Sequence, residues 1–209
     1  AAFGATPSGL TPLSRTNNLV QLILPGGLAG FEGGIMFSAG EGGTAANGQH
    51  KGIAAHLGYA NGPLSLWAAS TVTENDITTA GRFKDQLLAG KYNFGPVSVT
   101  VGLRRFAYAS SRQTNALLAA VVPVGAGQIK ASLLRADMAG RVGNTDVSGG
   151  DATQLGLGYV HSLSKRTVLY ATYARINNGN ASTFVVPDGP TAVRGRDSSG
   201  FEAGIRHTF

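Results

Sequence analysis

The feature that most limits how this sequence can fold is a two-residue alternation of apolar with polar or small side chains, repeated in many short segments. Successive side chains of a β-strand point to opposite faces, so each such segment predicts a strand with one apolar face. The closing stretch shows the pattern clearly. One face carries Phe201, Ala203, Ile205, His207 and Phe209, and the other carries Glu202, Gly204, Arg206 and Thr208. The alternation predicts an all-β protein.

Two kinds of connection separate the alternating segments. Short turns alternate with longer polar segments along the chain. The short turns include 61–63 (Asn-Gly-Pro) and 95–96 (Gly-Pro), and the longer segments include 40–49, 140–150 and 177–199. An antiparallel up-and-down transmembrane β-barrel has this arrangement, with turns at one rim and loops at the other. We count about eleven strands, and we expect turns and loops to alternate strictly between them.

The aromatic residues indicate which medium the apolar faces meet. They gather near the strand ends that reach the short turns: Tyr59, Tyr92, Phe94, Tyr159 and Phe209. Membrane barrels carry such a girdle at the level of the lipid headgroups, whereas a soluble β-sandwich has no reason to keep its aromatics at one end. We therefore expect the apolar faces to contact lipid.

The composition excludes several other classes. The most apolar stretch, Ala116 to Val124, is far shorter than the roughly 20 residues that a membrane-spanning helix needs. The net charge of +6 could indicate nucleic acid as a partner, but the Lys and Arg residues are scattered and form no basic stripe. We therefore expect neither a helical membrane protein nor a nucleic-acid-binding protein.

Patterns for catalysis or for cofactors are also missing from the sequence. There is no cysteine, and the four histidines show no metal-ligand spacing. His161 and Ser162 are neighbours in a predicted strand, so their side chains point to opposite faces and cannot act as base and nucleophile. We expect no enzyme activity, no cofactor and no metal.

The strand count has a consequence for closure. An antiparallel sheet with an odd number of strands cannot join its first and last strands, and an open edge is not tolerated in lipid. Residues 1–14 show no alternation and are predicted to be loop. We therefore expect further strands to precede Ala1.

Several segments resemble the trimeric general porins of Gram-negative bacteria, particularly the beta-proteobacterial type. The resemblance runs from residue 15 to the end of the chain. It rests on Arg15-Thr16-Asn17-Asn18 before a strand, Tyr92-Asn93-Phe94-Gly95, Gly158-Tyr159-Val160-His161-Ser162-Leu163-Ser164-Lys165-Arg166-Thr167 with Leu169-Tyr170, and Gly204-Ile205-Arg206-His207-Thr208-Phe209.

This resemblance implies a 16-stranded barrel, a homotrimer in the cell outer membrane, and passive diffusion of small hydrophilic solutes through each monomer. The strands counted here would then be the last eleven of the sixteen, and residues 1–209 would form one barrel domain without its first strands. Residues 1–14 would be the tail of the inward-folded constriction loop.

Charges on the inward face would set the selectivity of such a pore. With Tyr92 and Phe94 outward, alternation places Lys91 inward. The same counting places Arg104, Lys130, Arg206, Glu32 and Glu202 inward, while the side of Arg105 stays open. The resemblance adds Arg15, because the family commonly places arginines of the narrowest part of the pore there. The two acids are candidates for pairing with the cations.

The excess of inward cations predicts a diffusion porin that prefers anionic solutes, with outer-membrane lipid and two further copies of the chain as partners. Two alternatives belong to other classes. The chain could be an outer-membrane barrel enzyme, although we find no Ser/His or Asp/His group on one face near a rim. It could also be an adhesive β protein that binds a partner through outer loops such as 177–199.

Overall fold

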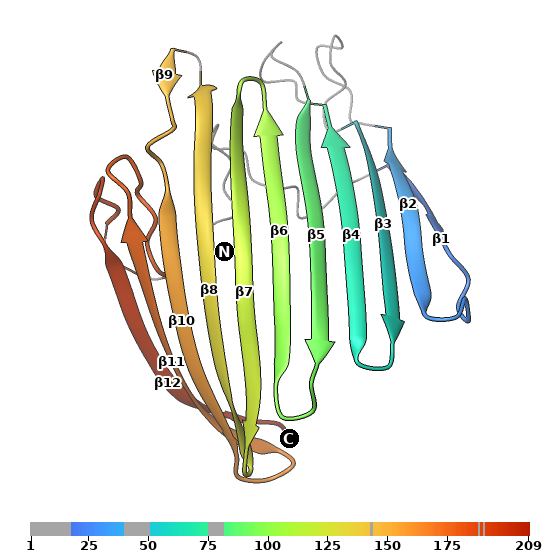
Figure 1. Cartoon of the computed structure of the whole chain (residues 1–209), viewed down its shortest axis with the longest axis vertical. Coiled ribbons are helices and arrows are strands. Elements are labelled where there is room, and N and C mark those ends of the chain that lie inside the picture. Colours follow the sequence, from blue (N-terminus) through green and yellow to red (C-terminus); the bar gives the residue numbers. More distant parts are fainter. Residues whose placement is uncertain (1–17, 40–50, 75–81, 143, 188, 190) are drawn as a thin grey trace.

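The computed structural model describes residues 18–39, 51–74, 82–142, 144–187, 189 and 191–209. These residues form one curved antiparallel sheet (Figure 1). Its strands are β1 (Leu19–Ile23), β2 (Phe31–Ser38), β3 (Gly52–Asn61), β4 (Leu64–Thr73), β5 (Phe83–Asn93), β6 (Ser98–Tyr108), β7 (Ser111–Val124), β8 (Gly127–Val142), β9 (Thr145–Asp146), β10 (Ala152–Ser162), β11 (Thr167–Asn178) and β12 (Ser198–His207).

The strands follow one another across the sheet in chain order. The order is β1-β2-β3-β4-β5-β6-β7-β8-β10-β11-β12, and β9 pairs only with β8. The prediction of an all-β, antiparallel, up-and-down sheet is confirmed, and eleven strands lie on the continuous path. The sheet is not closed, because β1 and β12 each pair with one neighbour only. The described residues contain no helix long and apolar enough to cross a membrane.

Short connections lie at one end of the sheet, which we call the turn end, and most long connections lie at the other, the loop end (Figure 1). The β5–β6 turn shows why a short connection suffices. The Asn93 Oδ1 atom accepts a hydrogen bond of 3.0 Å from the Gly95 backbone N–H. Gly95 has a φ of 92°, a conformation that only glycine adopts without strain. The chain therefore reverses direction within a few residues.

The expected strict alternation of turns and loops is wrong at one place. At the loop end, only Ala109 and Ser110 connect β6 to β7, a short turn where strict alternation requires a long loop. Ala109 takes a positive φ of 49°, and the Ser111 hydroxyl donates to the Tyr108 carbonyl at 2.8 Å. The polar residues Ser111, Arg112 and Gln113 belong to β7, with Ser111 and Gln113 buried on one face of the sheet and Arg112 exposed on the other.

Several strands also extend further toward the loop end than the apolar alternation indicates. β5 begins at Phe83, five residues before the first apolar outward residue Leu88, and β8 continues to Val142, inside the predicted polar segment 140–150. Beyond β8, the Ser148 backbone N–H donates to the Asp146 carboxylate at 2.8 Å. This hydrogen bond holds the pKa of Asp146 below its ordinary value. Polar residues near the loop end thus continue the strands above the apolar part.

Candidate functional site

The two faces of the sheet differ in what covers them. Glycine apart, the buried strand residues lie on one face, which we call the inner face: Ser38, Phe83, Phe106, Tyr108, Ser111, Gln113, Asn115, Ala136, Ala152, Ile176 and Ser198. The opposite, outer face carries large exposed apolar side chains, including Leu57, Leu88, Val101, Leu103, Leu118, Leu133, Leu157, Phe201 and Ile205. The inner face is therefore the candidate functional surface, and the outer face has the character of a surface that contacts lipid.

The connection between β11 and β12 contributes to the burial on the inner face. Val186, in this connection, is only 6% exposed and belongs to a cluster with Ala136, Ala152 and Ile176, which all point inward. Phe184 packs against the same cluster. The sequence predicted an outer loop over 177–199, whereas the structure shows that part of this segment is folded onto the inner wall. Such a segment narrows the space in front of β8, β10 and β11.

Asn178 holds this connection in place. Its side-chain amide donates to the backbone carbonyls of Phe184 and Arg196, both at 2.7 Å, and its Oδ1 accepts from the Phe184 N–H at 3.1 Å. The Ser198 hydroxyl accepts from the Val186 N–H at 3.2 Å. A segment tied by several hydrogen bonds and a buried apolar cluster is a fixed part of the wall rather than a free loop.

An ion pair stands on the inner face near the loop end. Arg104 on β6 contacts Asp85 on β5 with both ends of its guanidinium group, through Nε–Oδ1 at 2.9 Å and Nη2–Oδ2 at 2.6 Å. The guanidinium carbon lies 4.6 Å from the ring centroid of Phe106, which stacks in turn on Phe83 at 6.0 Å. The arginine side chain remains 40% exposed and the aspartate 14%. Arg104 therefore faces the lumen with its charge largely balanced by Asp85.

The other predicted cations lie apart from one another on the inner face. Lys91 pairs in register with Thr100, Lys130 with Val121, and Arg206 with Val168, all of which are inward positions. In contrast to Arg104, all three lie toward the turn end. Arg15, the remaining predicted cation, lies outside the described residues.

The acids do not pair with the cations as the sequence suggested. Glu32 lies on the inner face and folds over Gly58, where a Cβ atom would come within 2.7 Å of its side chain. Glu202 also points inward, and its Oε1 accepts a hydrogen bond of 2.8 Å from the Tyr170 hydroxyl. Within the described residues neither acid takes part in an ion pair. The expectation that they pair with some of the cations is not met in this part of the chain.

Three inner residues near the loop end were not among the predicted site residues: Asp85, Gln113 and Asn115. The Gln113 amide donates to the Asn115 Oδ1 at 2.8 Å, and both side chains are buried beside Phe106 and Arg104. A signal was present, because period-two counting continued beyond Leu88 and Ala116 places all three inward. The apolar alternation stops at Leu88 and Ala116, so strand ends predicted from it fall short of these three residues.

The outer face carries aromatic side chains at the turn end, as the sequence predicted. Ring centroids lie 4.7 Å apart in the pair Phe31–Tyr59, 4.6 Å in Tyr92–Phe94 and 5.0 Å in His207–Phe209. The structure also assigns Arg105, whose side the sequence left open. It pairs in register with Gln86 and Thr114 and points outward, toward the loop end.

Comparison with protein families and with known proteins identifies relatives of this chain. Residues 2–181 match a family model described as Gram-negative porin. The outer membrane porin protein 32 of Delftia acidovorans is 30% identical over 224 residues, and the alignment covers 100% of this chain and 60% of that protein. This chain therefore spans well under two thirds of the length of that relative.

Solved structures show the same fold at lower sequence identity. A porin structure superposes with a TM-score of 0.64 at 15% identity, and covers 91% of this chain and 60% of its own. The Salmonella typhi OmpF complex with daunomycin superposes with a TM-score of 0.62 at 12% identity, and covers 91% of this chain and 62% of its own. Both comparisons concern the arrangement of strands.

Proposed function

The chain belongs to the Gram-negative porin family, and from this membership we propose that the whole protein is a diffusion channel for small hydrophilic solutes. Membership places the protein in the cell outer membrane and makes it a channel rather than an enzyme. The observation that carries the proposal is the contrast between the faces of one sheet. The outer face exposes Leu88, Leu103 and Phe201, while the inner face carries Lys91, Arg104 and Lys130.

The proposed channel prefers anions. On the inner face of the described strands, the Arg104–Asp85 pair balances itself, so that Lys91, Lys130 and Arg206 stand against Glu32 and Glu202. Three cations against two acids leave an excess of one positive charge. Fixed charge in a narrow channel with walls of low dielectric constant acts on passing ions more strongly than it would in bulk water. The preference is therefore modest, and Lys91, Lys130 and Arg206 carry it.

The proposal includes the architecture that the family resemblance implies. In this proposal the chain supplies the later strands of a longer barrel of about 16 strands, and three such barrels assemble. The assignment of residues 1–14 to the tail of the constriction loop lies outside the described residues. Two observations support this arrangement. The chain spans 60% of the length of its relative, and in the described sheet β1 and β12 each have one edge without a partner strand.

Planar-bilayer recording of the purified protein tests the channel and its selectivity. We expect steady conductance steps and, across a KCl gradient, a reversal potential of the sign that indicates chloride preference. Replacing the unpaired cations (Lys91→Glu, Lys130→Glu, Arg206→Glu) should reverse that sign, because the inner face then carries an excess of acids. A bilayer that stays silent would contradict the channel, whereas conductance with unchanged selectivity in the variant would contradict only the assignment of these residues.

A further inference from the structure

The outer face changes from apolar to polar on several strands as they approach the loop end. The change runs from Leu88 to Gln86 on β5, from Leu103 to Arg105 on β6, from Ala116 to Thr114 on β7, from Leu133 to Arg135 on β8 and from Tyr173 to Arg175 on β11. On a membrane barrel, such a change marks the edge of the hydrocarbon layer. Side chains just above this edge lie among lipid headgroups.

Three cations form a cluster at this edge: Lys84 on β5, Arg105 on β6 and Arg112 on β7. Lys84 and Arg112 are both in register with Ala107, one on each side of it. Neighbouring strands lie about 4.8 Å apart, which puts these two Cα atoms about 10 Å apart, with Arg105 about 7 Å nearer the apolar band. All three side chains are exposed, and within the described part of the chain none of them forms an ion pair.

A hollow of about 210 Å³ lies beside Arg105 on the outer face. It is lined from that face by Gln86, Leu88, Leu103, Arg105 and Thr114. Its lining combines leucine side chains with groups that donate hydrogen bonds: a guanidinium, an amide and a hydroxyl. A guanidinium group suits a phosphate in particular, because its donors match two phosphate oxygens at once.

We propose that Lys84, Arg105 and Arg112 bind the phosphate headgroup of an anionic membrane lipid whose acyl chains cover Leu88 and Leu103. The proposal rests on the outer-membrane location and goes beyond the diffusion function, because it concerns the opposite face of the sheet. The lipid lies in the leaflet on the loop side. Charge complementarity favours lipid over a second copy of this chain. Among the described residues of the strands in the sheet path, Asp137 is the one acid on the outer face. It lies 4.0 Å from Arg135.

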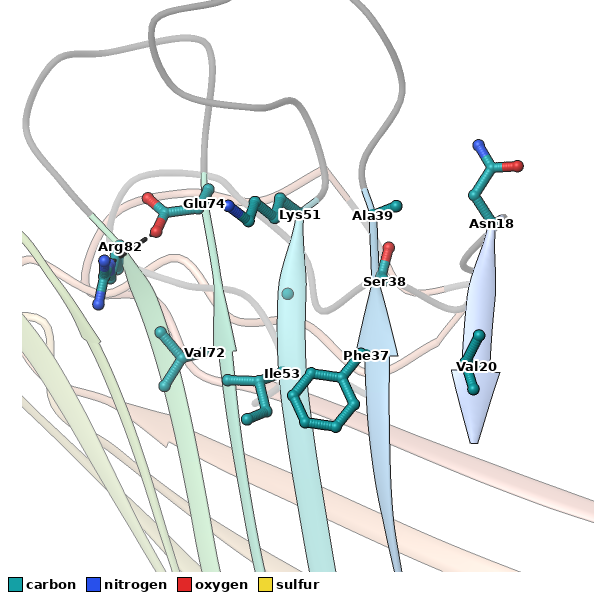
Figure 2. Close-up of a pocket in the computed structure, with 11 residues that line it drawn as sticks. Asn18, Val20, Phe37, Ser38, Ala39, Lys51, Ile53, Val72, Glu74 and Arg82 are labelled. Atoms are coloured by element: carbon teal, nitrogen blue, oxygen red, sulfur yellow. Dashed lines mark ion pairs between the residues drawn. The ribbon is translucent and has the colours of Figure 1, made fainter. Parts of the chain in front are cut away.

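A neighbouring groove repeats the combination of an apolar floor with a charged upper rim. It has a volume of about 440 Å³ and crosses β1 to β4 at the loop end. Figure 2 shows Val20, Phe37, Ile53 and Val72 along its floor, with the Lys51 and Arg82 side chains on either side of Glu74. Val72 is in register with Lys84, so the groove adjoins the cation cluster. Arg82 pairs with Glu74 at 2.7 Å, which makes this rim less cationic than the cluster of Lys84, Arg105 and Arg112.

Native mass spectrometry of the detergent-purified protein tests the proposal. Dioleoylphosphatidylglycerol is titrated as the anionic probe, with dioleoylphosphatidylcholine as the zwitterionic reference. The variant Lys84→Gln/Arg105→Gln/Arg112→Gln removes the cluster, and Lys91→Gln/Lys130→Gln/Arg206→Gln removes the same charge from the inner face. Near an anionic surface each Lys or Arg strengthens binding about fivefold, so the outer variant should lose binding of the anionic lipid on the order of a hundredfold. The inner variant should bind like the wild type.

Equal losses in the two variants would overturn the proposal, because total charge rather than this cluster would then explain the binding. No loss in the outer variant, or a change in its oligomeric mass without a change in lipid retention, would overturn it too. Single-channel conductance of the outer variant shows whether the barrel has folded, and a single Arg105→Gln variant replaces it if it has not. A wild-type protein that retains the anionic lipid but gives no conductance would refute the diffusion function and leave this proposal intact.

Discussion

Among single residues, Asp85 has the largest effect on the charge of the inner face, because it pairs with Arg104. Arg104 was predicted as a pore cation, and it does face inward, but its guanidinium is held in two hydrogen bonds by Asp85 and lies over the Phe106 ring. Because the arginine is substantially exposed, the pair adds little to folding stability. Its effect is on the field in the channel, where a balanced pair contributes much less than a lone cation.

Removal of either partner of this pair should therefore alter ion selectivity in opposite directions. Asp85→Asn leaves Arg104 unbalanced and should raise the anion-to-cation permeability ratio, whereas Arg104→Gln leaves Asp85 unbalanced and should lower it. A unit charge about 8 Å from an ion in water interacts with it by about 0.5 kcal/mol, so each change should be about twofold. Reversal potentials in a KCl gradient measure the ratio.

The double variant Asp85→Asn/Arg104→Gln serves as the control and should restore a ratio close to that of the wild type. If both single variants matched the wild type, the pair would lie away from the path of the ions.

Among the elements, the β11–β12 connection differs most from its prediction as an outer loop. It leaves the end of β11, returns along the inner wall and buries Val186 against Ala136 and Ile176 before β12 begins. Asn178 is the residue that joins its two ends, because one amide group contacts the carbonyls of both Phe184 and Arg196. Asn178 thus supplies three of the hydrogen bonds that hold this wall segment.

Substitution of that side chain should release the segment. Asn178→Ala removes three hydrogen bonds, and a net loss of about 2 kcal/mol raises the population of the open segment roughly thirtyfold. Trypsin cleavage after Arg194 and Arg196 should accelerate by the same factor, since cleavage follows the open population when closing is fast. Open-channel conductance should rise as well.

Asn180→Ala provides a matched control, because Asn180 is exposed and lies in the same connection. Its cleavage rate should equal that of the wild type. Equal cleavage rates of the two variants would contradict the conclusion that Asn178 holds this connection in place.

For the molecule as a whole, the strand order and the two faces could be predicted from the sequence, because both follow from local alternation. Leu118 and Leu133, for example, lie on the outer face, where period-two counting predicts them. The inward position of Val186 could not be predicted, because it depends on contacts with Ala136 and Ile176, which lie on other strands. The Arg104–Asp85 pair was missed for a related reason: it requires the register of β5 with β6.

A charge placed on the outer face should show which medium that face meets. Leu118→Lys puts an ammonium group among Val101 and Leu133 on the apolar band, which in lipid costs roughly 2–4 kcal/mol near mid-height. The folded fraction recovered in lipid vesicles, measured by its resistance to denaturation in gel electrophoresis, should fall sharply. Ala119→Lys places the same charge on the inner face and should fold like the wild type. Equal yields from the two variants would mean that the outer face does not contact lipid.

The two ends of the sheet differ in how much it costs to move them across a bilayer. Four of the connections at the turn end are brief, namely 62–63, 94–97, 125–126 and 163–166, and aromatic rings that tolerate the boundary of the bilayer flank them. The opposite end bears the cations Lys84 and Arg112 and longer polar segments, whose backbone groups would lose their water inside hydrocarbon. Moving the turn end across hydrocarbon would therefore bury fewer polar backbone groups than moving the loop end, so copies that insert from one side of a bilayer should share one orientation.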